Sequence, residues 1–201
     1  MKKAGKVFLD LLRESLTVWF FTFSISLVCI LILMIKSKTA NLLLLIAVFG
    51  VSLMMNFVLM RPVGEKHYRN MLSIKARDNY QKEYGVTPDG NFKEHAKFSP
   101  WKGFVITGLV HIPLFLMLIL KEVLPGKSAE TMEMVLIFAY QLYGGLVRLI
   151  SVKADAWFML ICAAMVITAG GVGYLWGGVR QLRIQLRIER RHNEIYGDIQ
   201  K

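Results

Sequence analysis

Four stretches of apolar residues dominate the pattern of hydrophobic and polar positions along the chain. They lie at 16–35, 42–60, 104–120 and 157–176, and none of them contains Lys, Arg, Asp or Glu. Each approaches the roughly 20 residues that an α-helix needs to cross the hydrocarbon core of a bilayer at about 1.5 Å per residue. Because lipid offers the backbone no hydrogen-bonding partner, runs this long must be helical. The pattern predicts an all-α, polytopic transmembrane helix bundle with four full spans.

A fifth apolar stretch, at 134–150, leaves the number of spans open. It is nearly long enough to cross, and its strongly polar residues are Gln141 and Arg148. One interpretation is a re-entrant or interfacial helix that breaks at Gly144-Gly145, because glycine tolerates irregular backbone. The other interpretation is a complete, tilted fifth spanning helix.

The remaining segments are predicted to lie at one face of the membrane. Residues 1–15 have the pattern of a short amphipathic helix in the interface. Residues 61–102 form a basic connection, with a helix expected over 64–84 and a turn over 87–90. In 179–201 the apolar residues alternate as in a strand, but the arginines gather on one helical face, which favours a basic tail helix. No connection is long enough for a separate soluble domain, so 1–201 is expected to be one integral membrane domain.

The distribution of Lys and Arg orients this bundle. With four spans, 19 of the 25 basic residues lie in 1–15, 61–102 and 179–201, and the positive-inside rule assigns their shared side to the cytoplasm. A fifth span would leave 15 inside and 10 outside, which is a weaker bias. The sequence therefore favours a plasma (cytoplasmic) membrane protein with both termini in the cytoplasm. The first apolar stretch is longer than the core of a signal peptide and follows Asp10 and Glu14, so we expect it to stay attached.

Small residues recur along the last predicted span. Ala169, Gly173 and Gly177 are spaced by four residues, and Gly170 lies beside them. This spacing leaves one side of a helix almost bare, so another helix can approach closely, and in lipid it drives helix association. It serves packing within the chain as readily as dimerisation, and packing within the chain is favoured.

Few polar side chains interrupt the apolar segments; the strongest are Asn56, His111, Gln141 and Arg148. One interpretation is a pathway for a proton or small solute, because ionisable residues inside membranes often mark such routes. The favoured one is that His111 joins helices through a hydrogen bond to Asn56, Gln141 or a backbone carbonyl. Arg148 then extends to the outer headgroups. Pro113, two residues after His111, removes a backbone hydrogen bond within the third span.

The basic face is expected to meet lipid. Its 19 basic residues oppose ten acidic ones, and each Lys or Arg near an anionic leaflet contributes about 1 kcal/mol of attraction. The densest group is the arginine stripe of the tail, which consists of Arg180, Arg183, Arg187, Arg190 and Arg191. Anionic phospholipids are therefore the expected partners. They account for the net charge of +11 without nucleic acid, which is not expected to bind.

No familiar catalytic or metal-binding motif occurs in the sequence. H-E-x-x-H, C-x-x-C, G-x-S-x-G and a phosphate-binding glycine loop are all absent. Cys29 and Cys162 lie within predicted spans, where thiols behave as small apolar groups. No catalytic residue, cofactor or metal is therefore predicted. Carboxylates approach interfacial histidines at two places, which are Glu65-x-His67 and Glu94-His95.

Three functions are compatible with these features. The favoured interpretation is a non-enzymatic subunit or scaffold with a basic, lipid-facing cytoplasmic surface, associated with a second copy or another membrane protein. The alternative is a component of a small-solute or ion transporter or channel, which uses the four intramembrane polar residues. The third is a membrane-bound enzyme that acts on lipid through the interfacial histidines and carboxylates.

Overall fold

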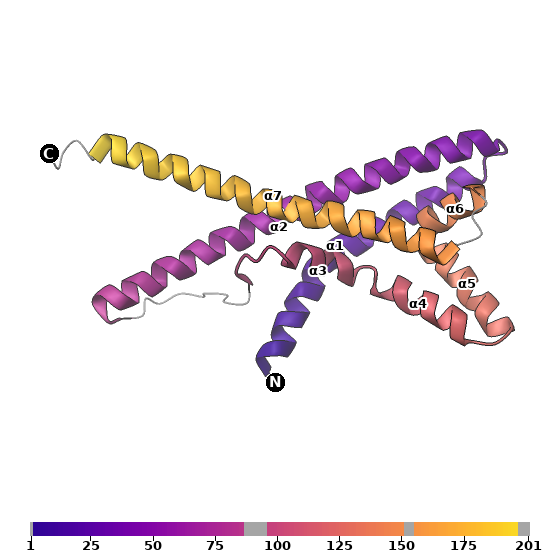
Figure 1. Cartoon of the computed structure of the whole chain (residues 1–201), viewed down its shortest axis with the longest axis horizontal. Coiled ribbons are helices and arrows are strands. Elements are labelled where there is room, and N and C mark those ends of the chain that lie inside the picture. Colours follow the sequence, from indigo (N-terminus) through magenta and orange to yellow (C-terminus); the bar gives the residue numbers. More distant parts are fainter. Residues whose placement is uncertain (1, 87–95, 151–154, 197–201) are drawn as a thin grey trace.

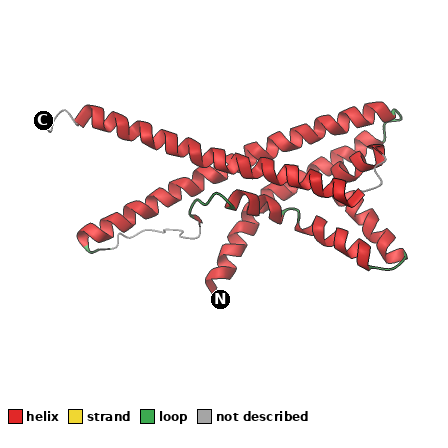
Figure 2. Cartoon of the chain, viewed as in Figure 1, coloured by secondary structure: helices red, strands yellow, loops and turns green. Residues whose placement is uncertain are grey.

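All regular structure is helical in the residues that the computed structural model describes, 2–86, 96–150 and 155–196, and no strand occurs there (Figure 2). In chain order the helices are α1 (Lys2–Leu33), α2 (Lys38–Tyr84), α3 (Lys102–Leu109), α4 (Ile112–Val123), α5 (Lys127–Ala139), α6 (Gln141–Ile150) and α7 (Asp155–Tyr196). The predicted all-α class is confirmed.

Three of these helices, α1, α2 and α7, are long and apolar enough to cross a membrane. A fourth candidate is the pair α3 and α4, if the two together form one span. The axes of this pair are bent by 52°. The stretch 104–120, predicted as one spanning helix, is thus two helices that meet at a bend. Pro113 has no N–H to donate into the preceding turn, and the His111 N–H instead bonds the Gly108 carbonyl at 2.9 Å in a tighter turn.

The stretch 134–150 is two helices, because α5 ends at Ala139 and α6 begins at Gln141. Between them Tyr140 has φ −123° and ψ 45°, outside the helical region. The break predicted at Gly144-Gly145 is wrong, since both glycines lie inside α6. With 13 and 10 residues, the two helices measure about 20 and 15 Å, so neither alone spans a hydrocarbon core of about 30 Å.

Helix α2 continues far beyond its apolar half. The Ser37 hydroxyl accepts a hydrogen bond from the Ala40 N–H at its start, and Gly85, with φ 70°, ends it. The helix expected over 64–84 is confirmed as the second half of α2, whereas the turn expected over 87–90 lies outside the described residues. The amphipathic leader 1–15 is not a separate helix, because α1 runs unbroken from Lys2 to Leu33.

The arrangement is built around a crossing of α2 and α7 near their middles (Figure 1). These two helices make the most extensive contact between elements, and beyond the crossing their C-terminal halves diverge (Figure 1). Helix α1 lies along α2, while α4, α5 and α6 gather at the end where α7 begins (Figure 1). The buried core has two parts, one around Leu45, Tyr143 and Val166 and one around Met60 and Tyr174.

Candidate functional site

The crossing of α2 and α7 uses the small residues of the last span. A Cβ added at Gly173 would lie 2.7 Å from the Cα of Phe57, and one at Gly177 would strike the backbone of Arg61. Gly170 faces the side chain of Thr107 on α3, and Ala169 is half-buried. The glycine face is thus occupied by α2 and α3 of the same chain, and it is not an exposed surface for a second copy.

A buried polar cluster joins three helices at the end of the bundle where the basic segments lie. The two ring nitrogens of His67 on α2 are bonded to Glu14 Oε1 on α1, at 3.0 Å, and to the Tyr174 hydroxyl on α7, at 2.9 Å. An ionised carboxylate only accepts, so Nε2 of His67 donates to Glu14. In the neutral ring Nδ1 then accepts from Tyr174. His67 is 1% exposed, and the cluster fixes α1 against α2 and α7.

Glu14 precedes the charge-free stretch of α1 and keeps its negative charge. Burial of the carboxyl acts to raise its pKa, but the hydrogen bonds from His67 and Lys66 and the positive charge of Lys66 outweigh burial, so the pKa of Glu14 lies below its ordinary value of 4.5. The Lys66 Nζ is 3.4 Å from Glu14 Oε1. Phe98 covers the cluster by stacking on Tyr174, with ring centroids 5.1 Å apart.

A second carboxylate, Glu65, joins the two long helices just beyond their crossing. Its Oε1 is 3.3 Å from Arg61 Nε and 3.0 Å from Arg180 Nη1, and Gln181 donates to its Oε2 at 3.5 Å. Burial acts to raise the pKa of Glu65, but Arg180 and Arg61 hold it below its ordinary value. The carboxylate therefore neutralises arginines from both helices at this point.

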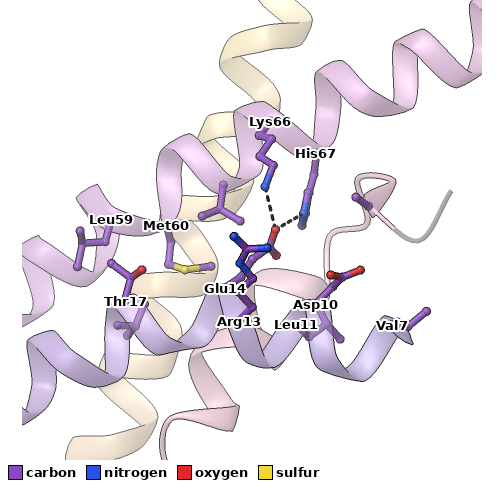
Figure 3. A pocket seen from close by; sticks show the side chains of 13 residues that line it. Val7, Asp10, Leu11, Arg13, Glu14, Thr17, Leu59, Met60, Lys66 and His67 are labelled. Atoms are coloured by element: carbon purple, nitrogen blue, oxygen red, sulfur yellow. Dashed lines mark hydrogen bonds and ion pairs between the residues drawn. The ribbon is translucent and has the colours of Figure 1, made fainter. Parts of the chain in front are cut away.

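A cavity of about 370 Å³ lies between α1 and α2 next to His67 (Figure 3). Charged side chains line one part of it, from Asp10, Arg13 and Glu14 on α1 and from Lys66 on α2. Figure 3 shows the carboxyl groups of Asp10 and Glu14 and the side chain of Lys66 directed into the space between the two helices. The cavity can hold a small charged group at the level where the apolar stretches begin.

A second buried polar cluster surrounds the bend between α3 and α4. His111 is fully buried; its Nδ1 donates to the Thr107 carbonyl at 3.0 Å, and its Nε2 accepts from the Tyr143 hydroxyl on α6 at 2.9 Å. The Tyr140 hydroxyl donates to the Val110 carbonyl at 3.1 Å. Together these bonds satisfy backbone and side-chain groups at the bend and attach α6 to it.

The other intramembrane candidates are dispersed. Asn56 is fully buried; its amide donates to the Ser52 carbonyl at 2.8 Å, and its carbonyl oxygen has no hydrogen-bond partner among the described residues. Gln141 is buried beside Tyr140. Arg148 lies on α6, but its side chain is outside the described residues. The structure shows no hydrogen bond that joins the described candidates to one another.

The arginine stripe lies on the exposed end of α7, which continues without a break to Tyr196. Arg180 is bound to Glu65, and the Arg183 guanidinium lies 5.8 Å from the centre of the Trp176 ring. The remaining three arginines, Arg187, Arg190 and Arg191, are exposed. The stripe is thus divided into two arginines held near the crossing and three that extend away from it.

Spacing in the sequence did not identify the partners of His67. Glu65 points to α7 instead, and Glu94 and His95 lie outside the described residues. The actual partners are 53 and 107 positions away in the chain, and only helix packing brings them together. Within the described residues, no group of three or more His, Cys, Asp or Glu side chains is placed to hold a metal ion.

No family model, curated protein or solved structure matches this chain. The fold and composition alone define its class, which is an all-helical membrane-type protein. Three of the described helices are suited to crossing a membrane, or four spans result if the bent pair counts as one.

Proposed function

We propose that this chain is a non-enzymatic subunit or scaffold, inserted in the cytoplasmic membrane with four spans and both termini in the cytoplasm. The observation that supports it most is the pair of arms formed beyond the crossing. Helix α2 continues for 24 residues after Met60 and α7 for 20 after Trp176, which corresponds to about 36 and 30 Å of helix. Two helices of this length, fixed to each other by close backbone contact and by Glu65, hold charged surface away from the bilayer at a defined angle.

The arginine stripe is proposed to serve two partners. Measured along the helix from Trp176, Arg180 and Arg183 lie about 6 and 10 Å away, whereas Arg187 lies about 16 Å away and Arg190 about 21 Å. Surface charge of a leaflet is screened within about 8 to 10 Å at physiological salt. The first two arginines therefore contact anionic headgroups, and the distal ones face a protein partner.

The alternative, a transport pathway, has less support. Both nitrogens of His111 already have protein partners, and the polar residues proposed to line a route are not joined in the described structure. An enzyme acting through His67 is also less supported, since its two nitrogens are engaged and the side chain is almost fully buried.

The test is native mass spectrometry of the full chain extracted from its own membrane in mild detergent. We expect a stoichiometric protein partner, either a second copy or another membrane protein. Changing Arg187, Arg190 and Arg191 to Gln should remove that partner and leave anionic lipid adducts. Changing Arg180 and Arg183 to Gln should reduce the lipid adducts by about thirtyfold, at about 1 kcal/mol per charge and with a factor of ten per 1.4 kcal/mol, and leave the partner. A wild-type chain that is only monomeric contradicts the proposal.

A further inference from the structure

The cavity between α1 and α2 has a lining that changes character along its length (Figure 3). Thr17 and Val18 on α1 and Leu59 and Met60 on α2 line the end that adjoins the charge-free stretches of both helices. The charged side chains of α1 and α2 line the rest of it, together with the apolar side chains of Val7, Leu11 and Val63. The charge-free stretch of α2 ends at the same level as the charge-free stretch of α1 begins. The cavity lining therefore changes from apolar to charged at the depth of the lipid headgroups. This gradient matches the junction between the acyl chains and the headgroup of a phospholipid.

The signs of the charges restrict the headgroup. Arg13 and Lys66 contribute two positive charges, and Asp10 and Glu14 contribute two negative charges, so the charged lining is balanced. This differs from the basic surface around it, where cations predominate. An anionic headgroup would meet two carboxylates in the cavity, whereas a zwitterionic headgroup meets charges complementary to both of its own.

The order of the charges along α1 also fits a zwitterion. Asp10 precedes Glu14 by four residues, about one helical turn or 6 Å farther from the apolar stretch. In phosphoethanolamine the phosphate lies next to the glycerol and the ammonium lies beyond it on a two-carbon linker. The phosphate thus falls at the level of Arg13 and Lys66, and the ammonium falls near the carboxylate of Asp10.

We propose that this cavity binds phosphatidylethanolamine from the leaflet at this end of the bundle. Arg13 and Lys66 donate to the phosphate, and the carboxylate of Asp10 accepts hydrogen bonds from the primary ammonium. The Lys66 side chain is 63% exposed, so it reaches a lipid while it remains close to Glu14. The volume of about 370 Å³ is within the range of about 300 to 1,000 Å³ that small-molecule sites occupy. This site is separate from the two arms and does not depend on the function proposed for them.

The proposal predicts discrimination between headgroups that differ only at nitrogen. Phosphatidylcholine carries the same charges, but its trimethylammonium group has no N–H to donate. Charge-assisted hydrogen bonds are about twice as strong as neutral ones, so their loss should weaken binding by at least about fivefold. Phosphatidylglycerol lacks the positive charge altogether and should bind more weakly than phosphatidylethanolamine as well.

The experiment is native mass spectrometry of the full chain in detergent, with equimolar phosphatidylethanolamine, phosphatidylcholine and phosphatidylglycerol of identical acyl chains. Phosphatidylethanolamine adducts should exceed each of the others by at least about fivefold. Asp10→Asn should bring the ratio of ethanolamine to choline lipid to about one. Glu189→Gln, the corresponding loss of a carboxylate on the exposed arm of α7, should leave the ratio unchanged.

A second measurement needs no variant. Mono- and dimethylated phosphatidylethanolamine should bind progressively more weakly as N–H groups are removed. Three results would each overturn the proposal. They are equal adducts with phosphatidylethanolamine, phosphatidylcholine and phosphatidylglycerol, a preference for phosphatidylglycerol, and a ratio of ethanolamine to choline lipid that Asp10→Asn leaves unchanged. Displacement of the lipid by soluble glycerophosphoethanolamine would overturn the assignment to a membrane lipid. None of these results depends on the distal arginines, so failure here is distinguishable from failure of the proposed scaffold function.

Discussion

A methyl group added at Gly173 is expected to force α2 and α7 apart. The new Cβ of Gly173→Ala would lie 2.7 Å from the Cα of Phe57, where ordinary contacts are 3.4 to 4 Å. The obstacle is backbone, which has no rotamer to change, so the helices must separate by about 1 Å over their main contact. Overpacking of this kind costs about 1 to 3 kcal/mol. The matched control is Gly50→Ala on α2, because nothing lies within 4 Å of the added atom there.

The assay is unfolding of the two variants in mixed micelles by increasing SDS, followed by far-ultraviolet circular dichroism. Gly173→Ala should lower the free energy of unfolding by about 1 to 3 kcal/mol relative to the wild type. Gly50→Ala should leave it unchanged or raise it slightly, since alanine is the better helix former. If the two variants unfold alike, the close crossing of α2 and α7 is wrong, and the glycines are available for another helix.

Two further predictions concern the polar clusters. Tyr143→Phe removes the hydroxyl that donates to Nε2 of buried His111. In the same assay it should lower the free energy of unfolding by about 1 kcal/mol. An unchanged free energy would show that this hydrogen bond contributes nothing. The pKa of Glu14 is depressed in the folded chain. Glu14 therefore contributes its full stabilisation when the pH is above the ordinary pKa of 4.5, and this stabilisation is lost as the pH falls from 4.5 through the lower pKa of the folded chain. Unfolding of the wild type measured between about pH 6 and pH 3 should show this loss, and Glu14→Gln should lack this component. Identical pH profiles would contradict the contacts of Glu14 with Lys66 and His67.

The sequence predicted the elements better than their contacts. Runs without charge determine where a helix can cross lipid, so α1, α2 and α7 follow directly from composition. The position of the break in the fifth apolar stretch could not be predicted from the sequence, because glycine inside a packed bundle can stay helical. Gly144-Gly145 remain helical within α6, whereas Tyr140 leaves the helix and places its hydroxyl on the Val110 carbonyl.

The polar contacts were harder to predict because they join distant parts of the chain. His111 was expected to find an amide or a backbone carbonyl, and it bonds both the Thr107 carbonyl and the Tyr143 hydroxyl. Tyr143 was missed as a partner because a tyrosine in an apolar segment is usually interpreted as an apolar ring and not as a hydroxyl donor. The sequence did contain a signal for the Glu14 cluster. A carboxylate immediately before a span needs a cationic or hydrogen-bonding partner at the same depth.

The topology is the central claim, and thiol labelling tests it most directly. The native Cys29 and Cys162 are buried, so single cysteines introduced at exposed Lys38, Lys82 and Glu194 report their own positions. In intact cells a membrane-impermeant maleimide should label Lys38→Cys, and it should label Lys82→Cys and Glu194→Cys only after permeabilisation. Labelling of Glu194→Cys from outside while Lys82→Cys stays protected would contradict an even number of crossings between the two arms, and with it the proposed orientation.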